Sequence, residues 1–309
     1  MNLAGQAAIV TGGGRGIGRA VALALARAGA GVLVLARTAA EVNTVAKEIR
    51  GCGGLALAHS GDVRKENDVA AAVERAMRAF GGVHILVNAA GIQGPIGPLW
   101  QNDLDAWRET LETHLLGTFL SCRAALPAMF AARRGNIINF SGGGAAGPRE
   151  NFSAYAASKA GVVRLTETLA EEVKPHNIQV NAIAPGAVFT RLTEQVIAAG
   201  SAAGSQGLAE ARRTREARTL PERAAELVLF LASPESGLLT GRLISAVWDD
   251  WPAMVRDFSE LAGAGGYTLR RLDPHVLSRA AESPALRPKE NTQPQSNAAV
   301  GGRSHARRD

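Results

Sequence analysis

Near its N-terminus the chain reads AAIVTGGGRGIG, from Ala7 to Gly18. The apolar run before Thr11 predicts a short buried strand, and apolar residues from Ile17 to Ala28 recur at the spacing of a helix. Glycines between a strand and a helix permit a tight turn and let the backbone approach a phosphate, toward which the first helical N–H groups point. The stretch therefore predicts a strand, a dinucleotide-phosphate loop and a helix. A plain strand-to-helix turn is the simpler alternative.

Short apolar runs and helical segments alternate along the rest of the chain. Further strands are predicted at 32–35, 55–58, 85–87, 137–140, 178–183 and 243–247, and helices at 39–50, 65–80, 104–132, 154–173 and 221–231. Such alternation requires crossover connections, which make the strands parallel and bury both faces of the sheet. The predicted fold class is α/β, a doubly wound parallel seven-stranded sheet with helices on both faces (Rossmann-type).

The length of 309 residues suits one α/β unit of about 250 residues with an extension. We predict a single dinucleotide-binding and catalytic domain over residues 1–250. Residues 251–282 then form a partly helical extension that contacts the pocket or a second subunit. Residues 283–309, with five basic and two acidic side chains and few apolar ones, predict a disordered basic tail. The Ala, Gly and Ser residues over 198–207 predict a mobile loop.

Composition excludes several classes of protein. The net charge is +6, but aromatic residues make up only 5%, which argues against a platform for stacking single-stranded nucleic acid. Cys52 and Cys122 fit neither a disulfide framework nor a zinc pattern and favour a reduced, cytoplasmic setting. The first ten residues lack a signal-peptide pattern, and no continuous apolar run reaches about 18 residues. We expect no membrane, nucleic-acid or metal partner, with DNA binding by the basic tail as the alternative.

The end of the second predicted strand bears on the choice of cofactor. Sites that prefer NAD usually carry an acid there, but this chain has Ala36 followed by Arg37. A guanidinium binds a 2′-phosphate through a fork of donors, and Arg15 in the glycine loop is a second candidate for the same phosphate. The sequence favours NADP(H) over NAD(H). Alternatively, both arginines are ordinary surface charges.

Tyr155 and Lys159 lie four residues apart in a predicted helix and so share one face. A neighbouring cation stabilises a phenolate, so we expect Lys159 to lower the pKa of Tyr155 toward the working pH. Such a phenol can act as a general acid or base on a carbonyl group. A Tyr-Lys pair at this spacing is common by chance, but the predicted phosphate loop upstream favours a catalytic role for this pair.

From about residue 3 to 245 the chain resembles the compact, single-domain branch of the short-chain dehydrogenase/reductase family, an NADP-preferring member by the residues above. The matching motifs, in order, are the glycine loop at 11–18, Asp62-Val63, Asn88-Ala89-Ala90-Gly91, Tyr155 with Lys159, and Pro185-Gly186 followed by Thr190. The resemblance implies a homodimer or homotetramer acting on a small-molecule alcohol or carbonyl substrate.

The resemblance also implies roles for individual residues. Asp62 and Val63 would flank the adenine, residues 88–91 would close the pocket floor, and residues 185–190 would hold the carboxamide. Tyr155 would exchange the proton, and Lys159 would bind the nicotinamide ribose. The full set of expected cofactor contacts is Gly12, Arg15, Gly16, Ile17, Gly18, Arg37, Asp62, Val63, Asn88, Ala89, Gly91, Tyr155, Lys159, Pro185, Gly186, Val188 and Thr190.

The sequence departs from the family pattern at the carbonyl-binding serine. Family members usually carry this serine 13 residues before the tyrosine, where this chain has Gly142, and Ser141 stands one residue earlier. Either the glycine-rich loop over 142–147 absorbs one extra residue and Ser141 donates to the carbonyl, or the donor is missing. We expect Ser141 to serve.

A second departure is His114, which stands where family members commonly carry an asparagine that supports a water in the proton relay. An imidazole can donate and accept, so His114 could hold such a water and titrate near neutral pH. A purely structural histidine is the alternative.

These observations predict an NADP(H)-dependent oxidoreductase that interconverts a secondary alcohol and a ketone, with Tyr155, Lys159, Ser141 and His114 as catalytic residues. A cofactor-binding sensor or scaffold with weak or no turnover is the alternative. The C-terminal part, with Trp248 and Trp251, differs from the family's usual ending. These tryptophans form a pocket wall, a subunit contact or a packing cluster.

Overall fold

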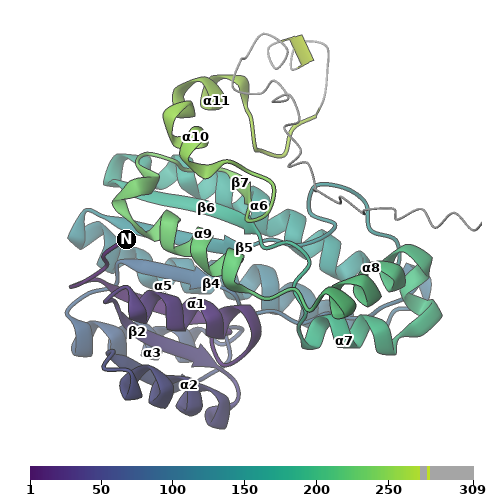
Figure 1. Cartoon of the computed structure of the whole chain (residues 1–309), viewed down its shortest axis with the longest axis horizontal. Coiled ribbons are helices and arrows are strands. Elements are labelled where there is room, and N and C mark those ends of the chain that lie inside the picture. The colour runs from purple at the N-terminus through teal and green to yellow at the C-terminus, as the bar shows by residue number, and fades with distance from the viewer. Residues whose placement is uncertain (272–276, 279–309) are drawn as a thin grey trace, which may run out of the picture.

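The computed structural model describes residues 1–271 and 277–278 (Figure 1). Within these residues the strands form one seven-stranded sheet in the order β3-β2-β1-β4-β5-β6-β7, and each neighbouring pair is parallel. The strands are β1 (Ala7–Thr11), β2 (Gly31–Ala36), β3 (Ala56–Ser60), β4 (Ile85–Asn88), β5 (Gly135–Phe140), β6 (Ile178–Ala184) and β7 (Leu243–Ser245). The predicted fold class is confirmed. The strand order reverses beside β1, where open α/β sheets bind ligands.

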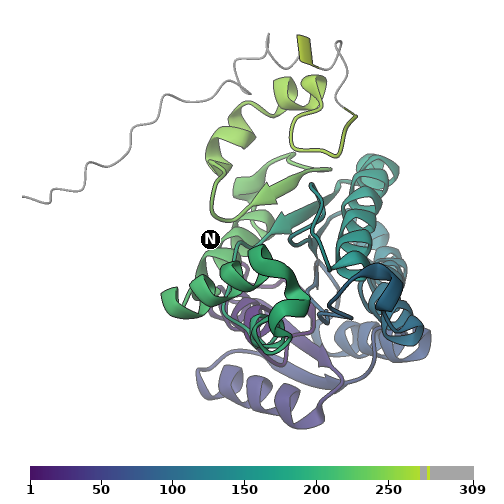
Figure 2. The ribbon, with the colours of Figure 1, turned by 90° about the vertical axis from the view of Figure 1, so that its right-hand side faces the viewer.

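Helices cover both faces of the sheet (Figures 1 and 2). The core on one face joins the sheet to α1 (Gly16–Arg27), α2 (Ala39–Gly51) and α9 (Glu222–Ala232). The core on the other face joins it to α3 (Glu66–Phe80), α5 (Gly117–Ala132) and α6 (Ser153–Val173). Short 3₁₀ turns lie at η1 (Leu99–Gln101), η3 (Lys174–His176) and η5 (Pro234–Ser236).

Strand β2 shows why these strands appear as uninterrupted apolar runs. Val32 and Val34 pack into the core with α1 and α2, whereas Leu33 and Leu35 pack into the core on the opposite face. Successive side chains of a strand point to opposite faces, so a strand buried on both faces has apolar residues throughout.

The helix predicted over 104–132 is divided. It consists of α4 (Leu104–Leu111), a π-helical turn η2 (Glu112–Leu116) and α5. By length and composition alone this segment could cross a membrane. In the fold it covers the sheet, with Cys122 and Met129 buried in the core. The π-helical turn interrupts the regular helical repeat at His114, and such turns often occur at functional sites.

The prediction of a loop over 198–207 is wrong. The segment is helical, because α7 (Arg191–Ala198) is followed by η4 (Gly200–Ala203) and α8 (Gly204–Ala217). The small residues permit close packing: Ala203 is buried, and a Cβ atom at Gly207 would lie only 3.0 Å from the ring of Phe152. Alanine also has the highest intrinsic helix propensity.

The described part of the C-terminal extension forms α10 (Trp251–Arg256) and α11 (Phe258–Ala264), which lie beyond the β7 edge of the sheet (Figures 1 and 2). Trp251 is buried, with its ring centroid 5.8 Å from that of Phe230, and its indole Nε1–H donates to the Ser245 carbonyl. Trp251 is therefore a packing residue, whereas Trp248 is 86% exposed. The tail predicted over 283–309 lies outside the described residues.

Candidate active site

A cavity of about 460 Å³ opens at the carboxyl ends of the parallel strands. Its wall includes residues that directly follow strands, since Gly12 follows β1, Ala89 follows β4 and Ser141 follows β5. The sequence-predicted residues that line it are Gly12, Arg15, Gly16, Ile17, Gly18, Arg37, Asp62, Val63, Ala89, Gly91, His114, Ser141, Tyr155, Lys159, Pro185 and Thr190. Residues far apart in the sequence thus meet in one site.

Three predicted contacts, Asn88, Gly186 and Val188, are not among the described residues that line the cavity. The Asn88 amide is buried and donates to Asn139 Oδ1 over 2.9 Å, so its side chain faces the core. Gly186 turns with a φ of +81°, and a Cβ atom there would lie 2.6 Å from Val247. Val188 is buried, and its carbonyl accepts a hydrogen bond from the Thr193 hydroxyl. These three residues therefore make contacts within the protein instead of lining the cavity.

The glycine loop has the close contacts that a phosphate cradle requires. A Cβ atom at Gly12 would lie 2.6 Å from Ala90 Cα, and one at Gly18 would lie 2.3 Å from the Gly12 carbonyl oxygen. Any larger residue would therefore displace the backbone or fill the space above the loop. Helix α1 begins here with no acid in its first turn and no side-chain cap. Its first N–H groups are available for an anion, so the loop fits the pyrophosphate of a dinucleotide.

Tyr155 and Lys159 both line the cavity, where Lys159 is buried and Tyr155 is partly buried. Lys159 Nζ donates to the Phe140 carbonyl oxygen over 2.8 Å and lies 5.7 Å from the centre of the Tyr155 ring. Burial lowers the pKa of Lys159 to about 8. Burial also raises the pKa of Tyr155, and the charge of Arg149 opposes this rise. The expected lowering of the Tyr155 pKa is therefore not found in this structure, because burial of the phenol has the larger effect.

Ser141 and Gly142 follow β5 beside Tyr155. The Ser141 hydroxyl is buried, lines the cavity and has no hydrogen-bond partner among the described residues. At Gly142, a Cβ atom would lie only 2.4 Å from Tyr155 Oη. The phenol hydroxyl thus occupies the space that a side chain at position 142 would need, and Ser141 presents its free hydroxyl to the cavity.

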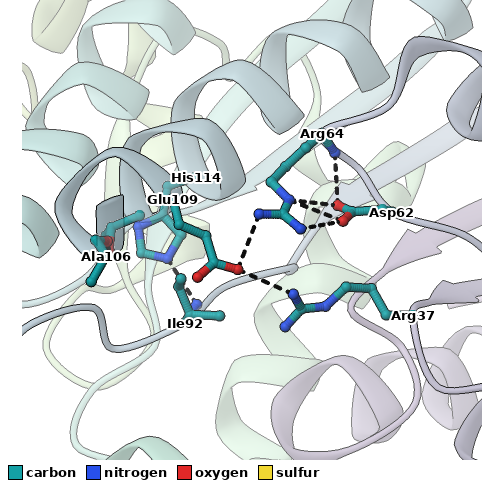
Figure 3. A network of polar contacts seen from close by, with 8 residues as sticks. Arg37, Asp62, Arg64, Ile92, Ala106, Glu109 and His114 are labelled. Atoms are coloured by element: carbon teal, nitrogen blue, oxygen red, sulfur yellow. Dashed lines mark hydrogen bonds and ion pairs between the residues drawn. The ribbon is translucent and has the colours of Figure 1, made fainter. Parts of the chain in front are cut away.

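Both ring nitrogens of His114 have partners within the protein. Nε2 accepts the Ile92 N–H over 3.1 Å (Figure 3), so Nδ1 carries the proton and donates to Ser158 Oγ over 2.7 Å. Ser158 in turn donates to the Tyr155 carbonyl, and the imidazole meets the Tyr155 ring edge-on at a centroid distance of 5.3 Å. Burial, followed by the charge of Lys159, lowers the pKa of His114 well below its ordinary value. The buried setting therefore does not favour titration of His114 near neutral pH.

The opposite end of the cavity contains ion pairs that sequence spacing did not predict. Arg37 Nη1 lies 3.3 Å from Glu109 Oε1, and Arg15 Nη1 lies 3.5 Å from Glu41 Oε1. Glu109 comes from α4 and Glu41 from α2, so only the fold brings them to these arginines. Burial alone would raise the pKa of Asp62, but its hydrogen bonds with Arg64 and the arginine's charge outweigh this effect and lower it (Figure 3).

The segment from Phe189 to Glu194, at the start of α7, closes one side of the cavity. Thr190 caps α7 in a capping box with Thr193. Phe189 and Leu192, for which no motif predicted a contact, add apolar surface to the cavity. No group of three or more metal-ligating side chains occurs within residues 1–271 and 277–278.

Comparison with known proteins places this site in a family. The family model described as "short chain dehydrogenase" matches residues 6–200. Cis-4-hydroxycyclohexanecarboxylate dehydrogenase of Sinomonas cyclohexanicum is 38% identical over 240 residues, which cover 78% of this chain and 94% of that protein.

Solved structures agree with this match. The structure is similar to a xylitol dehydrogenase with bound NAD⁺ at a TM-score of 0.74 and 28% identity, with coverage of 79% of this chain and 98% of that one. It is also similar to a metagenomic short-chain oxidoreductase in complex with NADP at a TM-score of 0.62 and 33% identity, with coverage of 74% and 91%. The chain belongs to the short-chain dehydrogenase/reductase family and is an NAD(P)-dependent oxidoreductase that acts on CH–OH groups.

Proposed function

We propose that this protein is an NADP(H)-dependent oxidoreductase that interconverts a secondary alcohol and a ketone, with Tyr155 as the acid and base. The observation that carries the proposal is the pair of hydroxyls at the inner end of the cavity. Tyr155 Oη lies against Gly142, and the neighbouring Ser141 hydroxyl is buried without a partner. A buried hydroxyl without a partner costs free energy that a substrate oxygen can recover by accepting its hydrogen bond.

The proton chemistry follows from burial. Because burial raises the pKa of Tyr155, the phenol is neutral in this structure and is in the form that donates a proton. In ketone reduction, Tyr155 gives its proton to the substrate oxygen while Ser141 donates a hydrogen bond to the same oxygen. In alcohol oxidation, Tyr155 takes the hydroxyl proton back.

Lys159 holds its ammonium group in place through the Phe140 carbonyl. An ammonium group has three donors, and one is used here, so the others remain for the ribose hydroxyls of a cofactor. Its positive charge favours a phenolate at Tyr155 when that residue gives up its proton. Lys159 is therefore both a binding residue and an electrostatic partner of Tyr155.

The residues present fit a nicotinamide dinucleotide. Gly12, Gly16 and Gly18 would hold its pyrophosphate, and Asp62 and Val63 would flank the adenine. Bound there, the nicotinamide supplies or accepts the hydride. We assign a 2′-phosphate to Arg37 and Arg15, because β2 ends with Ala36 rather than with an acid that would repel it.

The name of the bacterial relative, a dehydrogenase of a hydroxycyclohexanecarboxylate, supports a cyclic secondary alcohol as a substrate to test first. Cyclic ketones are reduced with NADPH or NADH while absorbance of the nicotinamide is followed. The Tyr155→Phe variant is expected to lose about 10²- to 10⁴-fold in kcat while still binding NADPH. Tyr267→Phe, a change of the other tyrosine in the chain, is the matched control.

The same experiment tests the rival function. Cofactor binding without reduction of any ketone, and no difference between Tyr155→Phe and the wild type, would identify a sensor or scaffold. For the cofactor assignment, Arg37→Ala is expected to weaken NADPH binding about tenfold and leave NADH binding unchanged. Equal effects on both cofactors would contradict the assignment of the 2′-phosphate to Arg37.

We also propose a cytoplasmic homodimer or homotetramer. Cys52 is exposed and unpaired, which suits a reducing compartment. Leu116 and Phe119, at the junction of the π-helical turn and α5, expose 40% and 45% of their surface and lie one helical turn apart, and contiguous exposed apolar surface marks subunit contacts. Light scattering measures the oligomeric state directly.

A further inference from the structure

At the adenosine end of the cavity, carboxylates of the chain already pair with the arginines. Arg37 and Arg64 both contact the same oxygen, Glu109 Oε1, at 3.3 and 3.0 Å (Figure 3). Arg64 also contacts Asp62, with Nη2 at 2.6 Å from Oδ2. The two arginines and two carboxylates therefore form a network without net charge.

Glu109 is anchored mainly through Arg64. The Arg64 guanidinium is fixed by Asp62 through Nε as well as Nη2, at distances of 2.6 to 3.1 Å. Arg64 therefore keeps a fixed position, and its contact with Glu109 is the shorter of the two that this carboxylate makes. A bidentate contact of this kind fixes the orientation of the arginine as well as stabilising the pair.

Arg37 is held less firmly than Arg64. Its contact with Glu109 is 3.3 Å long, and its side chain is 51% exposed. A guanidinium has five N–H donors in a planar fork, so a phosphate could draw Arg37 away while Glu109 stays on Arg64. Arg37 is also the residue to which the proposed function assigns the 2′-phosphate of NADP(H). Glu109 and that phosphate therefore require the same guanidinium.

We propose that Glu109 determines cofactor specificity: its carboxylate competes with the 2′-phosphate for Arg37 and so limits the preference for NADP(H) over NAD(H). This inference rests on the proposed function, because it requires Arg37 to bind the 2′-phosphate. With Glu109 neutralised, the network of Arg37, Arg64, Asp62 and position 109 carries one positive charge, which favours a dianionic phosphate.

The test measures binding rather than turnover, with two probes that differ only in the 2′-phosphate. Calorimetry gives the Kd values of adenosine 2′,5′-bisphosphate and adenosine 5′-monophosphate for the wild type and for Glu109→Gln. We expect the ratio of the two affinities to rise about threefold to tenfold in the variant, as loss of one exposed ion pair permits. Glu226→Gln, which breaks the exposed pair with Arg223 at 2.9 Å, is the charge-matched control and should leave the ratio unchanged.

A double-mutant cycle locates the effect. In the Arg37→Ala background, Glu109→Gln should change the ratio by less than twofold, because the guanidinium under competition is gone. An unchanged or lower ratio in Glu109→Gln would overturn the inference, and a lower one would show that Glu109 positions Arg37 for the phosphate. Glu109→Ala supplies the same test should the glutamine variant not fold, since alanine suits an exposed helical position.

The experiment distinguishes failure of the proposed cofactor preference from failure of the competition by Glu109. If the cofactor preference is wrong, the wild type binds the two probes equally, or Arg37→Ala leaves the ratio of their affinities unchanged. With the Arg37 effect present and no response to Glu109→Gln, only the competition is refuted.

Discussion

The hydroxyl of Tyr155 occupies the space in which a side chain at Gly142 would lie, because a Cβ atom there would come within 2.4 Å of Tyr155 Oη. This relationship explains why a glycine follows Ser141. The phenol approaches the strand end closely, and the buried Ser141 hydroxyl remains available beside it.

Gly142→Ala should therefore disturb the site more than the same change one residue later. The methyl group would push against the Tyr155 phenol, and a displacement of about 1 Å at the reacting group can cost about 10² in rate. At Gly143 a Cβ atom would lie 3.1 Å from Arg149 Nη1, the end of a flexible side chain that can move aside. We expect kcat to fall about 100-fold for Gly142→Ala and less than threefold for Gly143→Ala. Equal activity of the two variants would contradict this account.

Ser141→Ala removes the proposed donor to the substrate oxygen without placing a new atom in the cavity. By comparison with losses of oxyanion donors, kcat should fall about 10²- to 10³-fold. Because the hydroxyl has no partner among the described residues, thermal stability should not decrease. A large fall in the melting temperature with little change in kcat would indicate a structural role for Ser141 instead.

The strands and most helices could be predicted from the sequence, because burial of both sheet faces imposes continuous apolar runs and helical spacing. The π-helical turn at Glu112–Leu116 could not, since it changes the backbone and leaves the apolar composition of 104–132 unchanged. The helix α8 was missed for a different reason. Its small residues matter only because Phe152 packs against them.

In the site, spacing within one segment identified the glycine loop and the pair of Tyr155 and Lys159. It could not identify Glu109 as a partner of Arg37, because these residues lie on different elements and meet only in the folded chain. It also gave the wrong direction for the Tyr155 pKa. A spacing of four residues places Lys159 near Tyr155. The burial that raises the Tyr155 pKa depends on the tertiary structure, which the spacing does not reveal.

His114 should make the protein sensitive to acid. In the folded state its pKa lies well below 6.5, whereas in the unfolded chain it gains a proton near that value. The unfolded state therefore binds more protons as the pH falls below about 6.5, and the folded state loses stability there. His114→Gln should reduce this loss. Chemical unfolding at a series of pH values measures the free energy of unfolding of each protein. His176→Gln, on the exposed turn η3, is the control. Identical slopes for wild type and His114→Gln would refute the role.

Arg149 should set the pH range of activity. Burial raises the pKa of Tyr155, and the Arg149 charge is what opposes the rise. Arg149→Gln should raise this pKa further, so the loss of ketone reduction at alkaline pH should begin at a higher pH. Arg149 also stacks on Phe152, with its guanidinium carbon 4.2 Å from the ring centre, so Arg149→Lys separates charge from packing. The lysine variant should restore the wild-type pH profile. A profile that shifts equally in both variants would assign the effect to packing.

Lys159 should destabilise the protein below about pH 8 when no cofactor is bound. Its pKa is lowered from 10.5 to about 8 by burial, so between these values the unfolded chain holds a proton that the folded chain has released. The folded state therefore gains stability as the pH rises through this window, by up to about 3 kcal/mol for a wholly buried amine. Lys159→Met removes the ionisable group, so its unfolding free energy should lack this rise. The unfolding free energy of the wild type should therefore rise relative to that of Lys159→Met between pH 8 and 10.5. Lys174→Met, on the exposed turn η3, should follow the wild type at every pH, and parallel curves for Lys159→Met and wild type would show that Lys159 keeps its proton in the fold.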